Sequence, residues 1–501
     1  MADQPLAVID IGSNSGRMLV ARSPTGEHVE VLAEERVPLR LARELRDSDK
    51  IGTDAIDRTI ESIRDFLTLA KAAGVVRTLA VATAAVREAS NATELLERIH
   101  RETGLEIEIV DGDREAALAF LGAVHSLPIE DGVLVDVGGG SVEIARFRGR
   151  RLEHVWTMPL GALRLSDRFI TSDPPGRGDR RRLVDHVVEI LREMSIPRLG
   201  EQERMVGTGG TVRTLAKMDR RERNYPIPRL HGYLLERARV DELTELVSSR
   251  PLAKRAVLSG LSSDRADSIV GGALTLQTIM DELGARGVTV SGRGLREGIA
   301  LDALTDGPAP ASAVRTASVA ALTGRLASLF DIDRATRRAA FAKAFMAAAD
   351  PQIDDEITEM LGHAAMLLDS GTSLDAYNRH EHAASVVVGG DLVGFSHEQL
   401  ALVAAIIRRA DKENAGLKPF RTLLRTYDPV SVTRAATILA VADAVDRRLP
   451  NGAATAAVRA SAKTLTIVAP IPRGRWSQLL DERVRVVCGR RLTIDLKEAS
   501  S

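Results

Sequence analysis

The stretch VIDIGSNS (Val8–Ser15) returns later in the chain as VDVGGGS (Val135–Ser141). In both copies an apolar run reaches an aspartate, then one apolar residue, and then glycine and other small residues. Two copies of one strand-and-turn unit indicate two successive α/β units with the same local architecture. We therefore expect a cleft between these two units in which both turns bind a phosphate.

The segments around this repeat alternate in the same way over about the first 300 residues. Asp54–Ala73 is amphipathic and is expected to form a helix. Strands are expected at LAVIDIG, RMLVARS, TLAVATA, EIEIVDG, GVLVDVG, VEIARF, RMVGTGG and GVTVSG. This alternation is typical of an α/β fold.

The alternation ends at the Pro/Ala-rich segment GPAPAS (Gly307–Ser312), where we place a boundary. Beyond it, Ala-rich segments with helical spacing predict helices, and the tail segments TLTIVAP and VRVVCGRRLTIDL predict strands. The helices are expected at Thr316–Leu329, Arg334–Ala349, His397–Ala410 and Val432–Arg448. The expected domains are α/β domains at 1–122 and 123–306, a mainly helical domain at 307–448 and a small β-containing domain at 449–501.

Composition limits the class of protein. Hydrophobic residues make up 44% and charged residues 27% of the chain, and no run of about 18 apolar residues occurs, so a membrane-spanning protein is not expected. The chain has one cysteine, Cys488, and no signal-like N-terminus, so we expect a cytoplasmic protein without an intramolecular disulfide. The net charge of −1 does not indicate a nucleic-acid binder, so any polyanion site must be local.

Three glycine-rich turns follow predicted strands, and the third leads into a predicted helix at Val212–Lys217. Backbone N–H groups that no side chain obstructs can cradle a phosphate. Neither a Walker A motif nor a G-x-G-x-x-G fingerprint is present there. One such turn alone is more often a tight connection, but three together favour a phosphate site. The predicted phosphate-binding residues are Gly12, Ser13, Asn14, Ser15, Gly138, Gly139, Gly140, Ser141, Gly207, Thr208, Gly209, Gly210 and Thr211.

Carboxylates lie close to the first two turns. Asp10 and Asp136 each stand at the end of a predicted strand, and Glu143 lies on the strand after the second turn. Carboxylate oxygens of this kind could hold Mg²⁺ between the protein and substrate phosphates, although a single strand-end carboxylate is more often a turn cap. The pairing of Asp136 with Glu143 around a triple glycine favours a metal site.

Two further residues are candidates for chemistry. Glu115 lies in the first turn of a predicted helix that Asp113 is expected to cap, where a carboxylate is usually only a favourable partner of the helix dipole. Arg87 follows a predicted strand, where its guanidinium could clamp a phosphate or could simply begin a surface helix.

The chain resembles the exopolyphosphatase/guanosine pentaphosphate phosphatase family, within the actin-like (RNase H-like) ATPase superfold. Besides the two repeat segments, the resemblance rests on ATAAVREA (Ala82–Ala89), GDREA (Gly112–Ala116), PLGALRL (Pro159–Leu165), GTGGT (Gly207–Thr211) and SGRGLREG (Ser291–Gly298). It implies that Glu115 is the catalytic base, Arg87 the phosphate-binding arginine, and Asp136 with Glu143 the magnesium ligands. The implied reaction is in-line attack of water on a terminal phosphorus, and the need for a monovalent cation such as K⁺ stays open.

The C-terminal half resembles an HD-type helical domain in DLVGFS (Asp391–Ser396) and ATILAVADAVD (Ala436–Asp446). The His-Asp pair of such domains is Leu368-Asp369 here, and Ala410 stands where a histidine would be expected, while His380 and His382 remain. The resemblance therefore implies a degenerate metal site in a domain that forms a channel wall and a dimerisation element.

Three functions fit these features. Hydrolysis of inorganic polyphosphate is favoured, guanosine pentaphosphate (pppGpp) hydrolysis is the alternative, and a non-enzymatic protein that senses either ligand is the third. The expected partners are one of these polyanions and a second copy of the chain, with no nucleic acid and no membrane.

Overall fold

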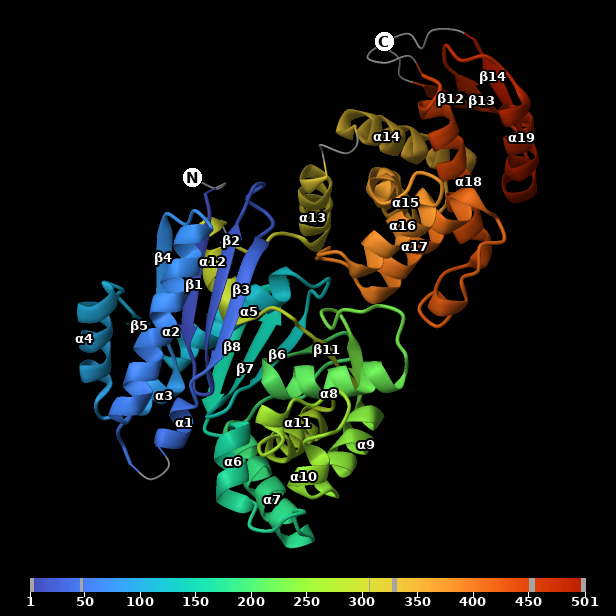
Figure 1. The fold of residues 1–501 in the computed structure, drawn as a ribbon. Coiled ribbons are helices and arrows are strands. Elements are labelled where there is room, and N and C mark those ends of the chain that lie inside the picture. The colour runs from blue at the N-terminus through green and yellow to red at the C-terminus, as the bar shows by residue number, and fades with distance from the viewer. Residues whose placement is uncertain (1–3, 46–47, 306, 327–330, 450–455, 497–501) are drawn as a thin grey trace. The chain divides into compact units, whose positions relative to one another are not determined.

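The computed structural model describes residues 4–45, 48–305, 307–326, 331–449 and 456–496 (Figure 1). The chain forms two compact units, one of residues Met1–Tyr225 and Leu230–Val314, the other of Pro226–Arg229 and Arg315–Ser501. The division after Val314 lies a few residues beyond the boundary expected at residue 306. Residue 306 itself lies outside the described ranges. In the described part of the chain, no helix is long and apolar enough to cross a membrane.

The first unit contains two mixed sheets. The first sheet has the order β3-β2-β1-β4-β5, in which β1 pairs antiparallel with β2 and parallel with β4. Its strands are β1 (Leu6–Ile11), β2 (Ser15–Arg22), β3 (Glu30–Pro38), β4 (Arg77–Ala82) and β5 (Glu108–Ile109). Helices α1 (Leu41–Glu44), α2 (Thr53–Ala72), α3 (Ala84–Glu88) and α4 (Ala92–Thr103) complete what we call the first domain.

The second sheet has the order β10-β11-β9-β6-β7-β8. Its strands are β6 (Gly132–Val137), β7 (Val142–Arg148), β8 (Arg151–Met158), β9 (Arg204–Thr208), β10 (Leu234–Glu236) and β11 (Gly287–Val290). Helices α6 (Ala162–Phe169), α7 (Arg177–Glu193), α8 (Gly209–Glu222), α9 (Arg237–Ser248), α10 (Leu252–Arg255) and α11 (Ile269–Leu283), with the 3₁₀ turn η1 (Ser263–Arg265), complete the second domain.

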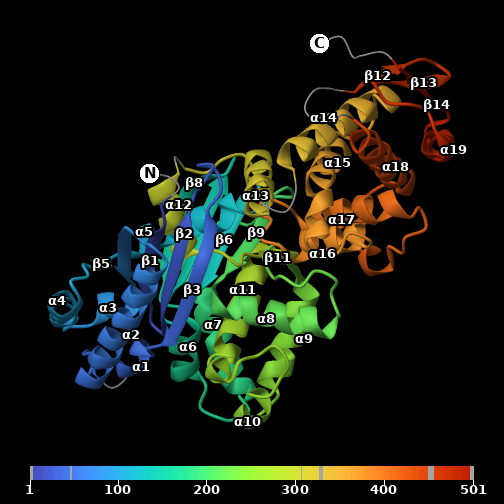
Figure 2. The same ribbon diagram turned by 45° about the horizontal axis from the view of Figure 1, so that its top comes forward.

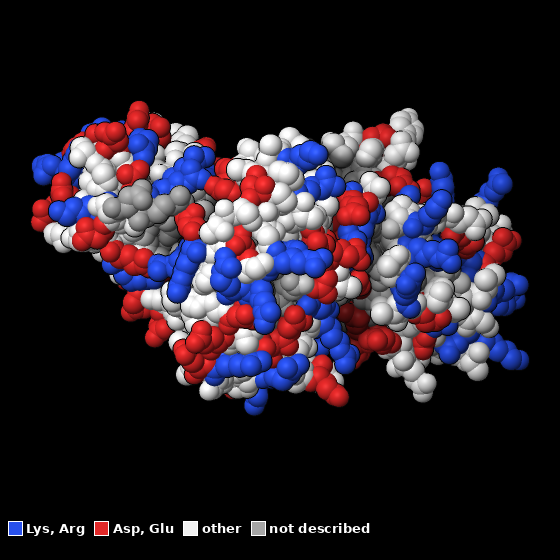
Figure 3. All heavy atoms as spheres, turned by 90° about the horizontal axis from the view of Figure 1, so that it is seen from below, with Lys and Arg blue, Asp and Glu red and all other residues white. Residues whose placement is uncertain are grey.

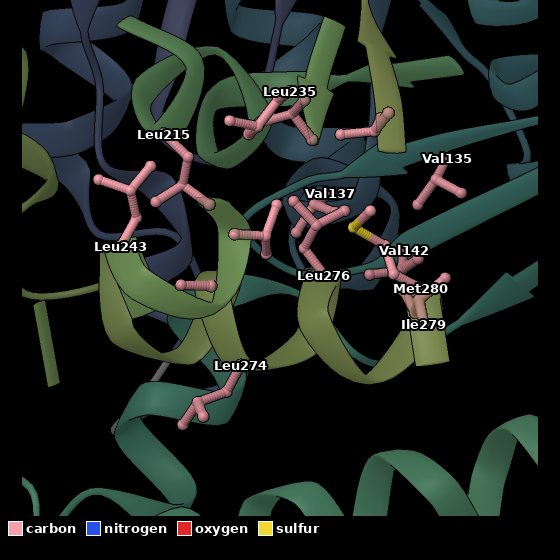
Figure 4. Packing of buried hydrophobic residues seen from close by; sticks show 14 of the residues in the cluster. Val135, Val137, Val142, Leu215, Leu235, Leu243, Leu274, Leu276, Ile279 and Met280 are labelled. Carbon is pink, nitrogen blue, oxygen red and sulfur yellow. The ribbon is translucent and has the colours of Figure 1, made fainter. Parts of the chain in front are cut away.

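The central helix α11 is buried against the second sheet. Its Leu276, Ile279 and Met280 lie in one apolar cluster with Val137 and Val142 of the sheet (Figure 4). Because these side chains leave water together, their burial is the main stabilising term for this domain.

Two helices, α5 (Gly112–His125) and α12 (Leu295–Leu304), lie between the sheets (Figure 2). On α5, Leu118 packs in the core of the first sheet while Phe120 packs in a cluster with the second sheet. A Cβ on Gly122 would lie 2.1 Å from the carbonyl oxygen of Gly294, and one on Gly298 would lie 1.8 Å from that of Leu118. Only glycine permits this crossing, which fixes α5, and the catalytic candidate at its start, against both sheets.

The second unit is mainly helical, as expected. It contains most of α13 (Ala311–Arg325), then α14 (Ile332–Ala349), α15 (Asp355–Leu367), η2 (Leu368–Ser373), α16 (Arg379–Gly389), α17 (His397–Asp411), η3 (Lys418–Phe420) and α18 (Pro429–Asp446). The chain ends in β12 (Ala457–Ala460), β13 (Thr464–Val468), α19 (Arg475–Cys488) and β14 (Arg491–Asp495). The end of the expected helix Thr316–Leu329 and parts of the expected last domain, at 327–330, 450–455 and 497–501, lie outside the described residues.

Two differences from the sequence predictions have physical causes. The segment VRVVC was predicted as a strand but is the last part of α19, where Val484 is buried while Val486 is exposed. The strands β3, β8 and β10 were not predicted, and all three are sheet edges with many exposed residues. An edge strand that faces solvent needs no regular apolar alternation, so its pattern is weak.

Candidate active site

The two copies of the repeat form equivalent hairpin turns. The Gly12 amide donates to the Ser15 carbonyl at 3.2 Å, and the Gly138 amide donates to the Ser141 carbonyl at 3.1 Å. The turns come from different domains yet meet, because a Cβ built on Gly140 would lie 3.8 Å from the Ser13 hydroxyl oxygen. Both turns line one cleft between the two domains.

The third glycine segment is a helix start rather than a loop. Helix α8 begins at Gly209, whereas the sequence predicted that the helix would begin at Val212. Thr208, Gly209, Gly210 and Thr211 line the cleft, so the helix N-terminus presents amide groups there. Gly207 does not line it. A Cβ on Gly207 would lie 2.5 Å from a methyl carbon of Val288, so this glycine is required by strand packing.

Four carboxylates gather where the sheets end. Asp10 on β1, Asp136 on β6 and Glu143 on β7 all line the cleft, and Asp136 and Glu143 are cross-strand partners. Glu115, from the first turn of α5, lines the same cleft. Burial raises the pKa of all four, and repulsion from neighbouring carboxylates adds to the effect for Asp10, Glu115 and Glu143. The pKa of Asp10 rises to about 6 and that of Glu115 to about 7.

This cluster has the chemistry of a cation site. Asp10 Oδ1 and Glu143 Oε1 are buried without a hydrogen-bond partner. A divalent cation would satisfy these oxygens and relieve the repulsion that raises the pKa values. Among the described residues, no three Asp, Glu, His or Cys side chains are arranged to hold a metal by themselves. A hard cation such as Mg²⁺ commonly takes one or two carboxylates and completes its shell with water and substrate phosphates.

Glu115 is oriented by the helix start and by Arg87. The cap of α5 is Asp111, whose side chain accepts from the Arg114 amide at 2.8 Å, so the prediction that Asp113 caps this helix was wrong. Arg87, in α3, donates from Nη1 to Glu115 Oε2 at 3.3 Å and to the Val110 carbonyl at 2.5 Å. Arg87 itself does not line the cleft, so here it supports Glu115 from behind.

Four arginines complete the cleft and were not predicted as site residues: Arg17, Arg213, Arg265 and Arg296. The surface face shown in Figure 3 mixes acidic and basic side chains. Burial, with repulsion from neighbouring arginines, lowers the pKa of Arg17 and of Arg265 to about 10. A polyanion that enters would relieve this repulsion.

The cleft therefore combines carboxylates with arginines. The charges that act most strongly on Glu143 are those of Glu115 and Asp136, whereas Asp10 and Asp136 also feel Arg17, Arg213 or Arg296. Arg17 could have been found from the hairpin register, because it is the cross-strand partner of Asp10. Nothing in the sequence around Arg265 pointed to the cleft.

The C-terminal unit holds a second group of buried charges. Asp369 accepts from Arg338 at 2.7 Å and from Arg379 at 2.8 Å, and both arginines also contact Asp443. Two guanidinium groups thus occupy the space beside these carboxylates that a metal ion would need. Leu368 and Ala410 are buried apolar residues.

The family follows from comparison with known proteins. The model of the Ppx/GppA phosphatase family matches residues 19–306, and that of Ppx/GppA phosphatase domain III matches residues 314–472. The chain belongs to this family. Proteins named exopolyphosphatase 1 are 34% identical over 329 residues in Mycobacterium tuberculosis and 32% identical over 311 residues in Mycobacterium leprae.

Solved structures of the family give its fold. An exopolyphosphatase from Cytophaga hutchinsonii is 28% identical with a TM-score of 0.56, and a family member from Aquifex aeolicus is 29% identical with a TM-score of 0.54. These matches confirm the actin-like α/β fold of the first unit. The M. tuberculosis match covers 64% of this chain but 95% of the relative, and the C. hutchinsonii match covers 60% and 99%. These relatives therefore correspond to little more than the first unit.

Proposed function

We propose that this protein is an exopolyphosphatase that hydrolyses the terminal phosphate of inorganic polyphosphate. The presence of buried carboxylates and four arginines in one cleft is the observation that carries the proposal. A chain end needs an acidic site where water is activated, and the following phosphates need cations, which Arg17, Arg213, Arg265 and Arg296 supply in one continuous cleft. The named activity of the relatives supports the same substrate.

In the proposed reaction Glu115 orients and deprotonates the attacking water. A general base is effective when its pKa lies near the working pH, and burial brings the pKa of Glu115 to about 7. Arg87 holds the carboxylate through Oε2, which leaves the other oxygen to accept the water proton. The amides of Gly12–Ser15 and Gly138–Ser141 and the start of α8 bind the phosphate oxygens, so the developing charge meets donors already in place.

Asp136 and Glu143, with Asp10 beside them, are the proposed ligands of a magnesium ion. Such an ion, when bound, would neutralise charge on the phosphate oxygens, which would favour attack of water on the terminal phosphorus and departure of the shortened chain. The buried oxygens of Asp10 and Glu143 without partners support this assignment.

Guanosine pentaphosphate is the alternative substrate that the family name includes. Its triphosphate end would use the same carboxylates and turns, so the two substrates differ only in what binds the rest of the molecule. A regulatory protein without activity would have no need of the carboxylates around Glu115.

For the C-terminal unit we propose a supporting role in a cytoplasmic homodimer: it holds long chains and contributes to dimerisation. The arginines beside Asp369 and Asp443 argue against an HD-type metal centre as a second catalyst.

A comparison of substrates tests the main proposal. Phosphate release from long polyphosphate and from guanosine pentaphosphate, each with Mg²⁺, should give the larger kcat/KM for polyphosphate. A larger value for the nucleotide would assign the alternative activity, and no release from either would refute hydrolysis.

A further inference from the structure

A loop of the second domain carries an arginine into the cleft. Arg265 ends the 3₁₀ turn η1 and lines the cleft beside the start of α8. Its guanidinium lies directly on Gly210, where a Cβ would be 1.7 Å from Arg265 Nη1. A side chain at position 210 would therefore displace the Arg265 guanidinium from its place beside the start of α8.

Arg265 lies in an unfavourable electrostatic environment. Its side chain makes no hydrogen bond or ion pair with any residue in the described ranges, and the repulsion from Arg17 and Arg36 is stronger than the attraction of the neighbouring Asp264. A half-buried cation beside other cations is unfavourable unless an anion joins them. The arrangement is therefore one that a bound polyanion would stabilise.

The residues on either side of Arg265 are tied to the first domain. Asp264 accepts from Arg36 of β3 at 2.9 Å, and Asp267 pairs with Arg43 of α1. Both pairs cross from one domain to the other at the cleft, and both are partly exposed, with side-chain exposures of 28% to 41%. Since exposed ion pairs are individually weak, each pair by itself holds the loop to the first domain only loosely.

The geometry points to Asp264 and Asp267 as positioning residues that set Arg265 over the phosphate-binding start of α8 when the two domains close. This inference rests on the proposed function. It adds that domain closure is coupled to the binding of the phosphates that follow the terminal phosphate of the polyphosphate chain. Arg265 acts on the substrate, and the two aspartates act only through Arg265.

The test is a set of variants assayed with long polyphosphate in the full-length protein. Arg265→Ala is expected to raise KM at least about tenfold, because a desolvated cation–phosphate contact is lost. The double variant Asp264→Asn/Asp267→Asn should raise KM roughly two- to fivefold, with kcat within about a factor of two, as expected for weak exposed pairs. The triple variant should match Arg265→Ala, because the aspartates then have nothing to position.

A matched control separates this effect from domain closure in general. Arg164 of α6 donates to both oxygens of Glu88 in α3, at 2.8 and 2.7 Å, and this pair also joins the two domains. Glu88→Gln combined with Arg265→Ala should give the product of the two single effects. The charge exchange Arg36→Asp/Asp264→Arg should reverse at least half of the increase in KM caused by Asp264→Arg alone. Equal melting temperatures would confirm that all variants are folded.

The outcomes are distinct. If the effects of the aspartate variants and of Arg265→Ala on KM multiply, or if the charge exchange does not lower the KM of Asp264→Arg, the positioning role is wrong. The enzyme would still be an exopolyphosphatase. If Glu88→Gln also has no effect in the Arg265→Ala background, closure in general and not the loop positions Arg265. A wild-type protein that releases no phosphate from polyphosphate overturns the proposed function itself.

Discussion

Arg87 donates through one nitrogen, Nη1, to both the Glu115 carboxylate and the Val110 carbonyl, at 3.3 and 2.5 Å. The resemblance implied that Arg87 binds phosphate, and this role stays a prediction; in this structure its guanidinium contacts the candidate base. The pair joins α3 to the first turn of α5, so the position and the acidity of Glu115 depend on a residue that does not line the cleft.

Replacing Glu115 by glutamine should lower kcat by about 10²–10⁴ while the fold and polyphosphate binding are kept, because the amide cannot accept the water proton. Steady-state phosphate release and a binding titration measure the two quantities. Turnover near that of wild type would remove Glu115 from the role of base.

Arg87 should control the acid limb of the pH profile. Its positive charge lowers the pKa of Glu115, which burial has raised to about 7, so Arg87→Ala should move the limb of kcat/KM to higher pH. Arg87→Lys keeps the charge and should shift the limb less. A profile unmoved in the alanine variant would mean that the limb belongs to another group.

Asp10 should make the protein less stable as the pH rises. Its pKa is about 6 when folded and near 4 when unfolded, so the folded state holds the proton more tightly between these values. Stability is therefore lost as the pH rises through this window. Without Mg²⁺, Asp10→Asn should match wild type near pH 4 and exceed it by on the order of 3 kcal/mol at pH 8. Urea unfolding at several pH values measures this difference, and a constant difference would contradict it.

The cation site should respond to loss of either proposed ligand. Asp136→Ala and Glu143→Ala should each raise the Mg²⁺ concentration needed for half-maximal activity, because one carboxylate ligand is lost. As a control, Asp302→Asn removes an exposed carboxylate that pairs with Arg114 and should leave the Mg²⁺ titration unchanged. Unaltered titrations in both alanine variants would place the cation elsewhere.

The C-terminal unit should affect long substrates more than short ones. A chain that ends at Val314 corresponds in extent to the shorter relatives, so it should fold and hydrolyse short polyphosphate. Its KM for long chains should rise. This KM should also depend less steeply on salt, because a protein that makes fewer phosphate contacts releases fewer counterions on binding. Circular dichroism and a cooperative melt provide the control, and unchanged relative efficiency for long and short chains would leave dimerisation as the role of this unit.

The sequence by itself determined the local features of this protein. The repeated Asp-x-Gly turns, the buried strands and the placement of Asp10, Asp136 and Glu143 at strand ends all follow from short-range patterns, because a strand and its turn are encoded by consecutive residues. The α/β character of the first unit and the helical character of the second could be predicted for the same reason.

Only the tertiary structure decided which distant residues share the cleft. Arg265 and Gly210 are far apart in sequence but in contact, and Gly207, from the same glycine segment, serves strand packing instead. Arg87 donates to Glu115 although the two residues lie on different helices, α3 and α5. Charge repulsion and burial depend on such long-range contacts, so the set of arginines in the cleft and the raised pKa of Glu115 could not be predicted from local sequence patterns.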